Sequence, residues 1–205
     1  MPLAFYVAYK SKFSYMNSKQ VMNHAADNIR ILAASMVEKA KSGHPGGAMG
    51  GADFINVLYA EYLQYDPQNP KWEGRDRFFL DPGHMSPMLY SQLALIGKFT
   101  LDELKQLRQW GSPTPGHPEV DVMRGIENTS GPLGQGHVFA VGAAIAAKFL
   151  AARTGNPTFN KETIYAYISD GGIQGKCIII AKDTFIQEVV IEGEVHTTLE
   201  GRTHL

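Results

Sequence analysis

The chain has 205 residues, of which 44% are hydrophobic and 19% charged, and its formal net charge at pH 7 is -1. This composition suits one globular domain, or at most one and a half. A net charge near zero provides no overall field for nucleic acid or an anionic membrane, and no apolar run approaches the length that spans a bilayer, so we expect neither partner. The single cysteine, Cys177, cannot form an internal disulfide, which favours a reducing compartment, the cytoplasm.

The first half of the chain predicts helices separated by turns. Apolar residues recur at helical spacing from about 18 to 42, which predicts a helix that ends at Gly43. The next segment, residues 43–51, is too rich in glycine for a helix or a strand. The elements predicted after it are, in chain order, a helix over 53–63, a short buried strand over 77–80 and a helix over 85–96.

In the second half, Thr100-Leu-Asp-Glu103 has the pattern of a capping box and predicts a helix to about Trp110. Helices that alternate with short apolar strands favour an α/β fold with a mainly parallel sheet flanked by helices. After Gln174 the sequence becomes β-branched and predicts a hairpin or meander over 176–200. The elements predicted in between are a long loop over 111–131, a helix over 136–152 and a strand over 163–168.

Two glycine-containing segments are candidates for a ligand site. Asp170 follows a predicted strand and precedes two glycines, and a carboxylate there suits Mg²⁺. Taken alone, that pattern is more often an ordinary Asp-Gly turn. Gly131-Pro-Leu-Gly-Gln-Gly136 opens a predicted helix, where glycines admit a cofactor and the helix N-terminus offers free N–H groups. A plain helix start with proline in its first turn would look similar.

Three histidines stand beside glycine or proline in predicted loops: His44, His84 and His117. Such an imidazole is accessible to phosphate or sugar hydroxyls and can transfer protons near neutral pH. Any one of them is as readily an idle loop histidine, but the three together favour a site. Short metal-binding spacings between histidines are absent from the sequence, so metal ligation by the trio is less attractive.

Five motifs in order resemble transketolase. They are Lys39-Ala-Lys-Ser-Gly-His-Pro-Gly46, Asp76-Arg-Phe-Phe-Leu80 with Gly83-His84, Thr114-Pro-Gly-His-Pro-Glu119, Thr129-Ser-Gly-Pro-Leu-Gly-Gln-Gly136 and Asp170-Gly171. One such motif is weak evidence for a family, whereas five in the same order and at fitting separations are specific evidence. The resemblance covers roughly residues 17–174. It implies a truncated thiamine diphosphate-binding fold, the diphosphate-side domain, preceded by an extension over 1–16 and followed by an atypical strand-rich tail over 175–205.

The resemblance also implies the chemistry. A transketolase moves a two-carbon ketol unit between sugar phosphates of the pentose phosphate pathway, with thiamine diphosphate and Mg²⁺, for which Ca²⁺ or Mn²⁺ can substitute. Its partners would be sugar phosphates and a second subunit, in a homodimer or as a separate C-terminal chain. The implied site residues are His44 and His117 on the sugar, His84 on the diphosphate, Gly131, Pro132, Leu133 and Gly171 along the cofactor, and Asp170 on the metal.

The sequence departs from the family after Gln174. The family has an asparagine metal ligand downstream of the Asp-Gly pair, and this chain has no Asn after Asn160. Asp183, Glu188 or Glu192 could supply oxygen instead. The chain also stops before the domain that carries the activating glutamate, so we expect little activity from it alone. The alternatives are a non-catalytic fragment that serves only in association and, among enzymes, a protein similar to dihydroxyacetone synthase.

Overall fold

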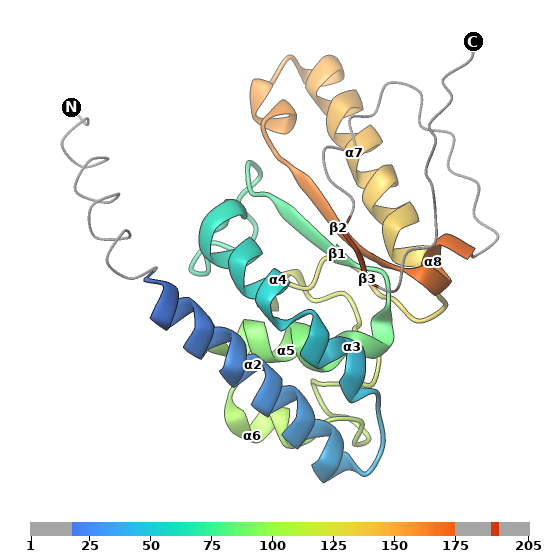
Figure 1. The fold of residues 1–205 in the computed structure, drawn as a ribbon. Helices are drawn as coiled ribbons and strands as arrows, with labels where there is room; N and C mark the ends of the chain where they lie inside the picture. The colour runs from blue at the N-terminus through green and yellow to red at the C-terminus, as the bar shows by residue number, and fades with distance from the viewer. Residues whose placement is uncertain (1–17, 175–189, 193–205) are drawn as a thin grey trace.

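The computed structural model describes residues 18–174 and 190–192. Its centre is a sheet of three parallel strands in the order β1-β2-β3: Arg77–Leu80, Ile164–Ser169 and Val190–Glu192. Helix α7 (Gln135–Thr154) packs on one side of β1 and β2, and the helices from the first half of the chain lie on the other side (Figure 1). The predicted α/β fold with a parallel sheet is thus confirmed.

The helices of the first half are built around α2 (Lys19–Ala40) and α5 (Ser86–Leu95), which pack on each other. The buried side of α2 repeats at helical spacing through Ala26, Ile29, Ala33 and Met36, as the periodicity predicted. The helix ends at Ala40, before the predicted glycine, because Lys41 adopts a left-handed conformation with φ 51°. Two short elements follow, α4 (Ala52–Val57) and the π-helix η1 (Leu58–Tyr62), where one helix was predicted.

The prediction that residues 43–51 form neither helix nor strand is wrong. They contain the short helix α3 (Pro45–Gly50), which packs against α2. Proline stands in its first turn, where its fixed φ suits a helix and its missing N–H has no intrahelical acceptor to lose. A Cβ on Gly51, the residue directly after α3, would lie 2.5 Å from the sulfur of Met88. That glycine therefore permits close packing on α5, a tertiary reason that the local pattern does not contain.

The remaining predicted elements of the described region are found, with shifted ends. The capping box at Thr100 is present, but its helix α6 (Leu101–Leu104) is shorter than predicted and continues as turns. The loop over 111–131 contains one 3-10 turn, η3 (Val122–Arg124). The other short elements are η2 (Gly83–Met85), η4 (Pro157–Asn160) and α8 (Asp170–Gln174).

The structure describes only part of the two ends of the chain. The extension over 1–16, Cys177 and most of the predicted hairpin or meander lie outside the described residues. Within the tail, β3 pairs parallel with β2, with Ile191 opposite Ile168.

Helix α7 is the described helix that is long and apolar enough to cross a membrane by length and composition. That property alone is weak evidence for a membrane span, since core helices of globular domains share it. In this structure α7 packs on β1 and β2.

Candidate active site

The two strand ends that carry the motif residues lie side by side. β1 and β2 run parallel, with Leu80 opposite Tyr167. η2, which contains His84, begins shortly after β1, and α8 begins with Asp170 directly after β2. The Asp170 carboxylate is close enough to oppose the lowering of the His84 pKa. Both motif residues therefore stand at the carboxyl edge of the sheet, where open α/β sheets bind their ligands.

The three loop histidines come together at this edge. The ring centroids of His44 and His84 are 5.1 Å apart, edge to face. Burial, and then the rings of His44 and His117, lower the pKa of His84. Burial, and then the cation of Arg108 and the ring of His44, lower the pKa of His117. A neutral imidazole presents one N–H donor and one acceptor nitrogen, so both rings are suited to sugar hydroxyls and to proton transfer.

The loop that carries His117 is held through its backbone while the histidine itself stays exposed. Four carbonyl groups of residues 114–118 accept hydrogen bonds, two from α5, one from Arg108 and one from Ser130. Burial raises the pKa of the Tyr90 hydroxyl, which keeps it protonated as a donor. The pairs are Arg108 N to Thr114 O (3.0 Å), Tyr90 Oη to Pro115 O (2.9 Å), Ser86 Oγ to Gly116 O (2.8 Å) and Ser130 N to Pro118 O (3.1 Å).

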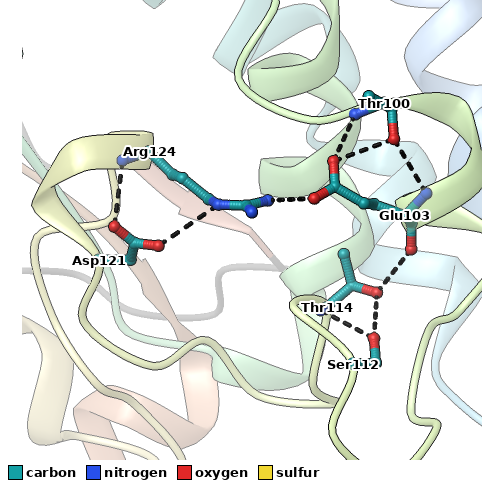
Figure 2. A network of polar contacts seen from close by, with 6 residues as sticks. All are labelled: Thr100, Glu103, Ser112, Thr114, Asp121 and Arg124. Carbon is teal, nitrogen blue, oxygen red and sulfur yellow. Dashed lines mark hydrogen bonds and ion pairs between the residues drawn. The ribbon is translucent and has the colours of Figure 1, made fainter.

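A second network fixes the start of this loop to α6 (Figure 2). The Thr114 hydroxyl donates to the carbonyl of Glu103 at 3.0 Å, and Thr114 is fully buried. The Glu103 carboxylate accepts from the Thr100 amide at 2.8 Å and pairs with Arg124 at 2.8 Å. Asp121 binds Arg124 from the other side, at both the backbone amide and the guanidinium. The loop is therefore a rigid support for His117, although it has almost no regular secondary structure.

The N-terminus of α7 is capped by a buried carboxylate. Gly134 has no side chain with which to cap the helix, and Asp81, fully buried at the end of β1, takes that role. Its oxygens accept from the amides of Gly134 (3.2 Å) and His137 (3.3 Å) and contact the His137 ring at 3.2 Å. The prediction that this terminus offers free N–H groups is therefore wrong for these two amides. His137, buried against this carboxylate, has a structural role.

Glycines in the motifs allow the segments to approach closely. A Cβ on Gly171 would lie 2.7 Å from Cδ1 of Leu133, so the Asp-Gly turn and the Gly-Pro-Leu segment are in contact. A Cβ on Gly136 would lie 2.3 Å from the Asp81 Cα, which explains how α7 starts so close to β1. Gly131, by contrast, has no atom within 4 Å of its Cβ position. Its open side, next to Pro132, leaves room for a ligand.

One buried hydroxyl in this region has no hydrogen-bond partner. Ser130 is 3% exposed, and its Oγ is unpaired. A Cβ on Gly83 would lie 2.6 Å from that Oγ and 3.0 Å from a ring carbon of His117. Because a buried unpaired hydroxyl is costly, it indicates a place where a bound group or a water would complete the bonding.

Among the described side chains, the magnesium ligand that the motifs predicted is Asp170. Asp170 is exposed at the start of α8. Within residues 18–174 and 190–192 no group of three His, Cys, Asp or Glu residues could hold a metal. Mg²⁺ often takes only one or two protein carboxylates and completes its shell with phosphate oxygens and water. A single carboxylate fits that pattern. Asp183 and Glu188 lie outside the described residues.

The comparisons with known proteins agree with this arrangement. The family described as "Transketolase, thiamine diphosphate binding domain" matches residues 21–181. Transketolase 1 of Escherichia coli is 50% identical over 149 residues, which are 71% of this chain and 22% of the relative. Chloroplastic transketolase-1 of Arabidopsis thaliana is 43% identical over 194 residues, 90% of this chain and 26% of the relative. This chain belongs to the transketolase family.

Solved structures support the same fold. A transketolase from Leishmania mexicana superposes with a TM-score of 0.71 at 45% identity, covering 76% of this chain and 24% of that one. A transketolase from Campylobacter jejuni gives a TM-score of 0.71 at 41% identity, covering 78% and 25%. The chain therefore spans about a quarter of the length of these transketolases.

The sequence reasoning missed three residues that shape the transketolase motifs: Asp81, Arg108 and Ser130. Asp81 looked only like the residue that ends a strand, yet its partners are 53 and 56 positions away in the chain. Arg108 carried no motif signal. Ser130 lay inside the Thr129–Gly136 motif, and a hydroxyl directly before the first glycine of that motif is a signal that could have been used. The roles assigned to the eight predicted site residues stay predictions.

Proposed function

We propose that this chain supplies the diphosphate-side half of a transketolase site, which transfers a two-carbon ketol unit between sugar phosphates with thiamine diphosphate and Mg²⁺. The observation that carries the proposal is the gathering of His44, His84 and His117 beside Asp170 at one edge of a parallel sheet. Membership of a family of transferases supports the reaction class.

The residues present fit the implied cofactor. Leu133, in contact with Gly171, provides an apolar wall, and the open side of Gly131 leaves space beside it. The buried hydroxyl of Ser130 has no hydrogen-bond partner and is available to a bound group. His84 is partly buried next to the Asp170 carboxylate, so an N–H donor for a diphosphate oxygen and an oxygen ligand for Mg²⁺ stand together. When bound, thiamine diphosphate supplies the carbon nucleophile and the electron sink that cleavage of a carbon–carbon bond requires.

The work of this chain's own residues is binding and proton transfer. His117, exposed on a rigid loop, would donate a hydrogen bond to a hydroxyl at the carbonyl end of the donor sugar. His44, beside His84, would accept a proton from a sugar hydroxyl and return it, the general acid–base role of an imidazole. His84 would hold the diphosphate oxygens through its N–H.

A partner is part of the proposal, because the chain spans only about a quarter of its relatives. Phe139, Ile145 and Phe149 on α7 are 49%, 54% and 65% exposed, an unusual amount of apolar surface for one helix. We expect the rest of a transketolase, in a homodimer or as a separate C-terminal chain, to cover this side and to provide the residues that activate the cofactor.

Calorimetric titration of the full chain with thiamine diphosphate tests the cofactor half of the proposal. We expect binding that requires Mg²⁺ and that weakens at least about tenfold in His84→Ala and Asp170→Asn, since each loses a charge-assisted contact. His24→Ala, an exposed histidine on α2, serves as the control and should bind like the parent chain. No heat at millimolar cofactor in the folded parent chain would overturn the proposal.

Complementation tests the partner half. The chain is mixed with a separately produced segment of the Escherichia coli transketolase 1 that lacks the matched part, and ketol transfer from a ketose phosphate to an aldose phosphate is assayed. We expect activity from the mixture and little from either piece alone. Cofactor binding without activity in a stable mixed complex would limit this chain to a non-catalytic role.

A further inference from the structure

Arg108 lies between two loops of the candidate site that are far apart in sequence. Its Nη1 donates to Ser42 Oγ at 2.9 Å, two residues before His44. Its backbone amide donates to Thr114 O at 3.0 Å, three residues before His117. A Cβ on Gly116 would lie only 2.8 Å from its Nε, so the guanidinium also rests on the backbone of the His117 loop. One side chain therefore contacts both histidine loops.

The backbone at Arg108 has an uncommon conformation. Its φ is 62°, and among residues 18–174 and 190–192 the only other non-glycine residue with a positive φ is Lys41. A left-handed conformation is disfavoured for a residue with a Cβ atom, and such positions gather where function requires a particular geometry. At this position it lets the Arg108 amide reach the Thr114 carbonyl while the side chain extends to Ser42.

The guanidinium has no carboxylate partner in the part of the chain that the structure describes: the ion pairs there involve other arginines, two lysines and His137. Its charge consequently acts on the histidines. The groups that face the His117 ring are Arg108 and His44, and both lower its pKa, after the effect of burial. His117 in turn acts on His84. An unpaired cation beside an imidazole disfavours the protonated ring.

We propose that Arg108 is a positioning residue that ties the His44 loop to the His117 loop and fixes the two imidazoles relative to each other. A role of Arg108 in catalysis rests on the proposed function, whereas its contacts with the two loops do not depend on that function. Arginine suits this task better than lysine because its planar fork can donate to Ser42 with one nitrogen while another lies over Gly116. Lysine offers a single point of attachment.

The two effects of Arg108, attachment and charge, can be separated by substitution. Arg108→Gln removes the charge and the reach to Ser42. Arg108→Lys keeps a charge but not the fork. Ser42→Ala removes only the acceptor hydroxyl on an exposed residue and leaves the arginine in place, so it remains informative if an Arg108 variant does not fold. Arg153→Gln, near the end of α7, is the control for loss of an arginine elsewhere.

The experiment is a pH titration of the histidine ring signals in the full chain by nuclear magnetic resonance, without cofactor, with thermal melting as a check of folding. We expect Arg108→Gln to raise the midpoint of His117 by about half a pH unit or more, since an adjacent cation is lost. Arg108→Lys should restore part of that shift. Ser42→Ala should leave the midpoint low but move the ring resonances of both His44 and His117.

The outcomes decide the proposal independently of cofactor binding. Unchanged His117 midpoints in folded Arg108→Gln, or unchanged ring resonances of His44 in both Arg108→Gln and Ser42→Ala, would overturn it. If the midpoint shifts as expected while the calorimetric titration with thiamine diphosphate stays flat, the tie stands and the transketolase proposal fails. In the complemented enzyme, Arg108→Gln should displace the acidic limb of the kcat/KM pH profile, which a purely structural loss would not do.

Discussion

Helices α5 and α7 have the same kind of sequence and opposite surroundings. Both are apolar around most of their circumference. In α5, eight residues from Ser86 to Leu93 are buried, whereas in α7 the buried residues are Gly136, His137, Ala140 and Ala147. A helix that is apolar all round belongs inside protein. α5 has that environment within the described residues, enclosed by α2, α3 and α4. α7 has it on one side only, facing β1 and β2.

This difference shows which part of the described fold is enclosed and which part is exposed to solvent. Within the described residues, α5 is enclosed by other helices, and the loop that carries His117 is held by hydrogen bonds to α5. The outer side of α7 carries large apolar side chains in solvent, and the relatives are about four times longer. The buried small residues of α7 are Gly136, Ala140 and Ala147, which allow close packing on that side. Stability and association should therefore respond to different residues of the same chain.

The largest expected difference is between buried leucine in α5 and exposed isoleucine in α7. Leu93→Ala should lower the free energy of unfolding by about 2–5 kcal/mol, because Leu93 is fully buried and a cavity would remain. Ile145→Ala should change it by less than about 0.5 kcal/mol, since that side chain is 54% exposed. Urea denaturation measures both. Equal losses would mean that α7 is as enclosed as α5 in the free chain.

Two glycines of α7 should respond in opposite directions. Gly136→Ala should cost about 1–3 kcal/mol because its Cβ would collide with the Asp81 backbone. Gly142→Ala should stabilise by about 0.5–1 kcal/mol because alanine is the better helix former and no atom lies within 4 Å. Thermal denaturation of the two variants tests whether one side of α7 is packed and the other side is open. Destabilisation by both would indicate that the outer side is already covered.

The regular elements were predictable because their signals are local. The strand at Arg77–Leu80, the helix after His84 and the capping box at Thr100 each follow from neighbouring residues. α3 was not predictable, since the close packing that Gly51 permits on α5 outweighs the glycine content. The burial of α7 could not be read from its sequence either, because its apolar residues point both toward the sheet and away from it.

The residues of the candidate site also fall into those that local sequence signals reveal and those that only tertiary contacts reveal. His44, His84, His117 and Asp170 were identified from their neighbours and from the family motifs, and the structure brings them to one edge. The residues that support them were not, because Asp81 and Arg108 act on groups 53 to 66 positions away. A single sequence contains no record of such pairs. The supporting residues became visible only from the folded arrangement.

Asp81→Asn should test how α7 is joined to the site. An amide would place N–H donors among the donors of Gly134 and His137, so we expect a loss of about 1–2 kcal/mol. Hydrogen exchange should accelerate in the first turn of α7 and not in α5. Asp102→Asn, an exposed aspartate in the first turn of α6, is the matched control and should change stability little. Uniformly faster exchange in both helices would argue against a local cap.

The smallest effect concerns Glu103, which helps to support the His117 loop on the α5 side of the molecule. The Thr100 amide first, and then Arg124, lower the pKa of the Glu103 carboxyl. A group whose pKa is depressed by folding contributes stability above its unfolded pKa, and that contribution is lost as the pH falls through the folded value. Because the side chain is 26% exposed and solvent screens the pair, we expect Glu103→Gln to cost less than about 1 kcal/mol at pH 7.

Acidification should remove that difference, since parent and variant then both carry an uncharged side chain at this position. Urea denaturation at pH 7 and near pH 3 measures it, with Glu61→Gln as a control, an exposed glutamate that has no ion pair among residues 18–174. A difference that stays constant with pH would assign the effect to packing. Loss on acidification would instead identify the charge of Glu103 as the link between α6, η3 and the loop that carries His117.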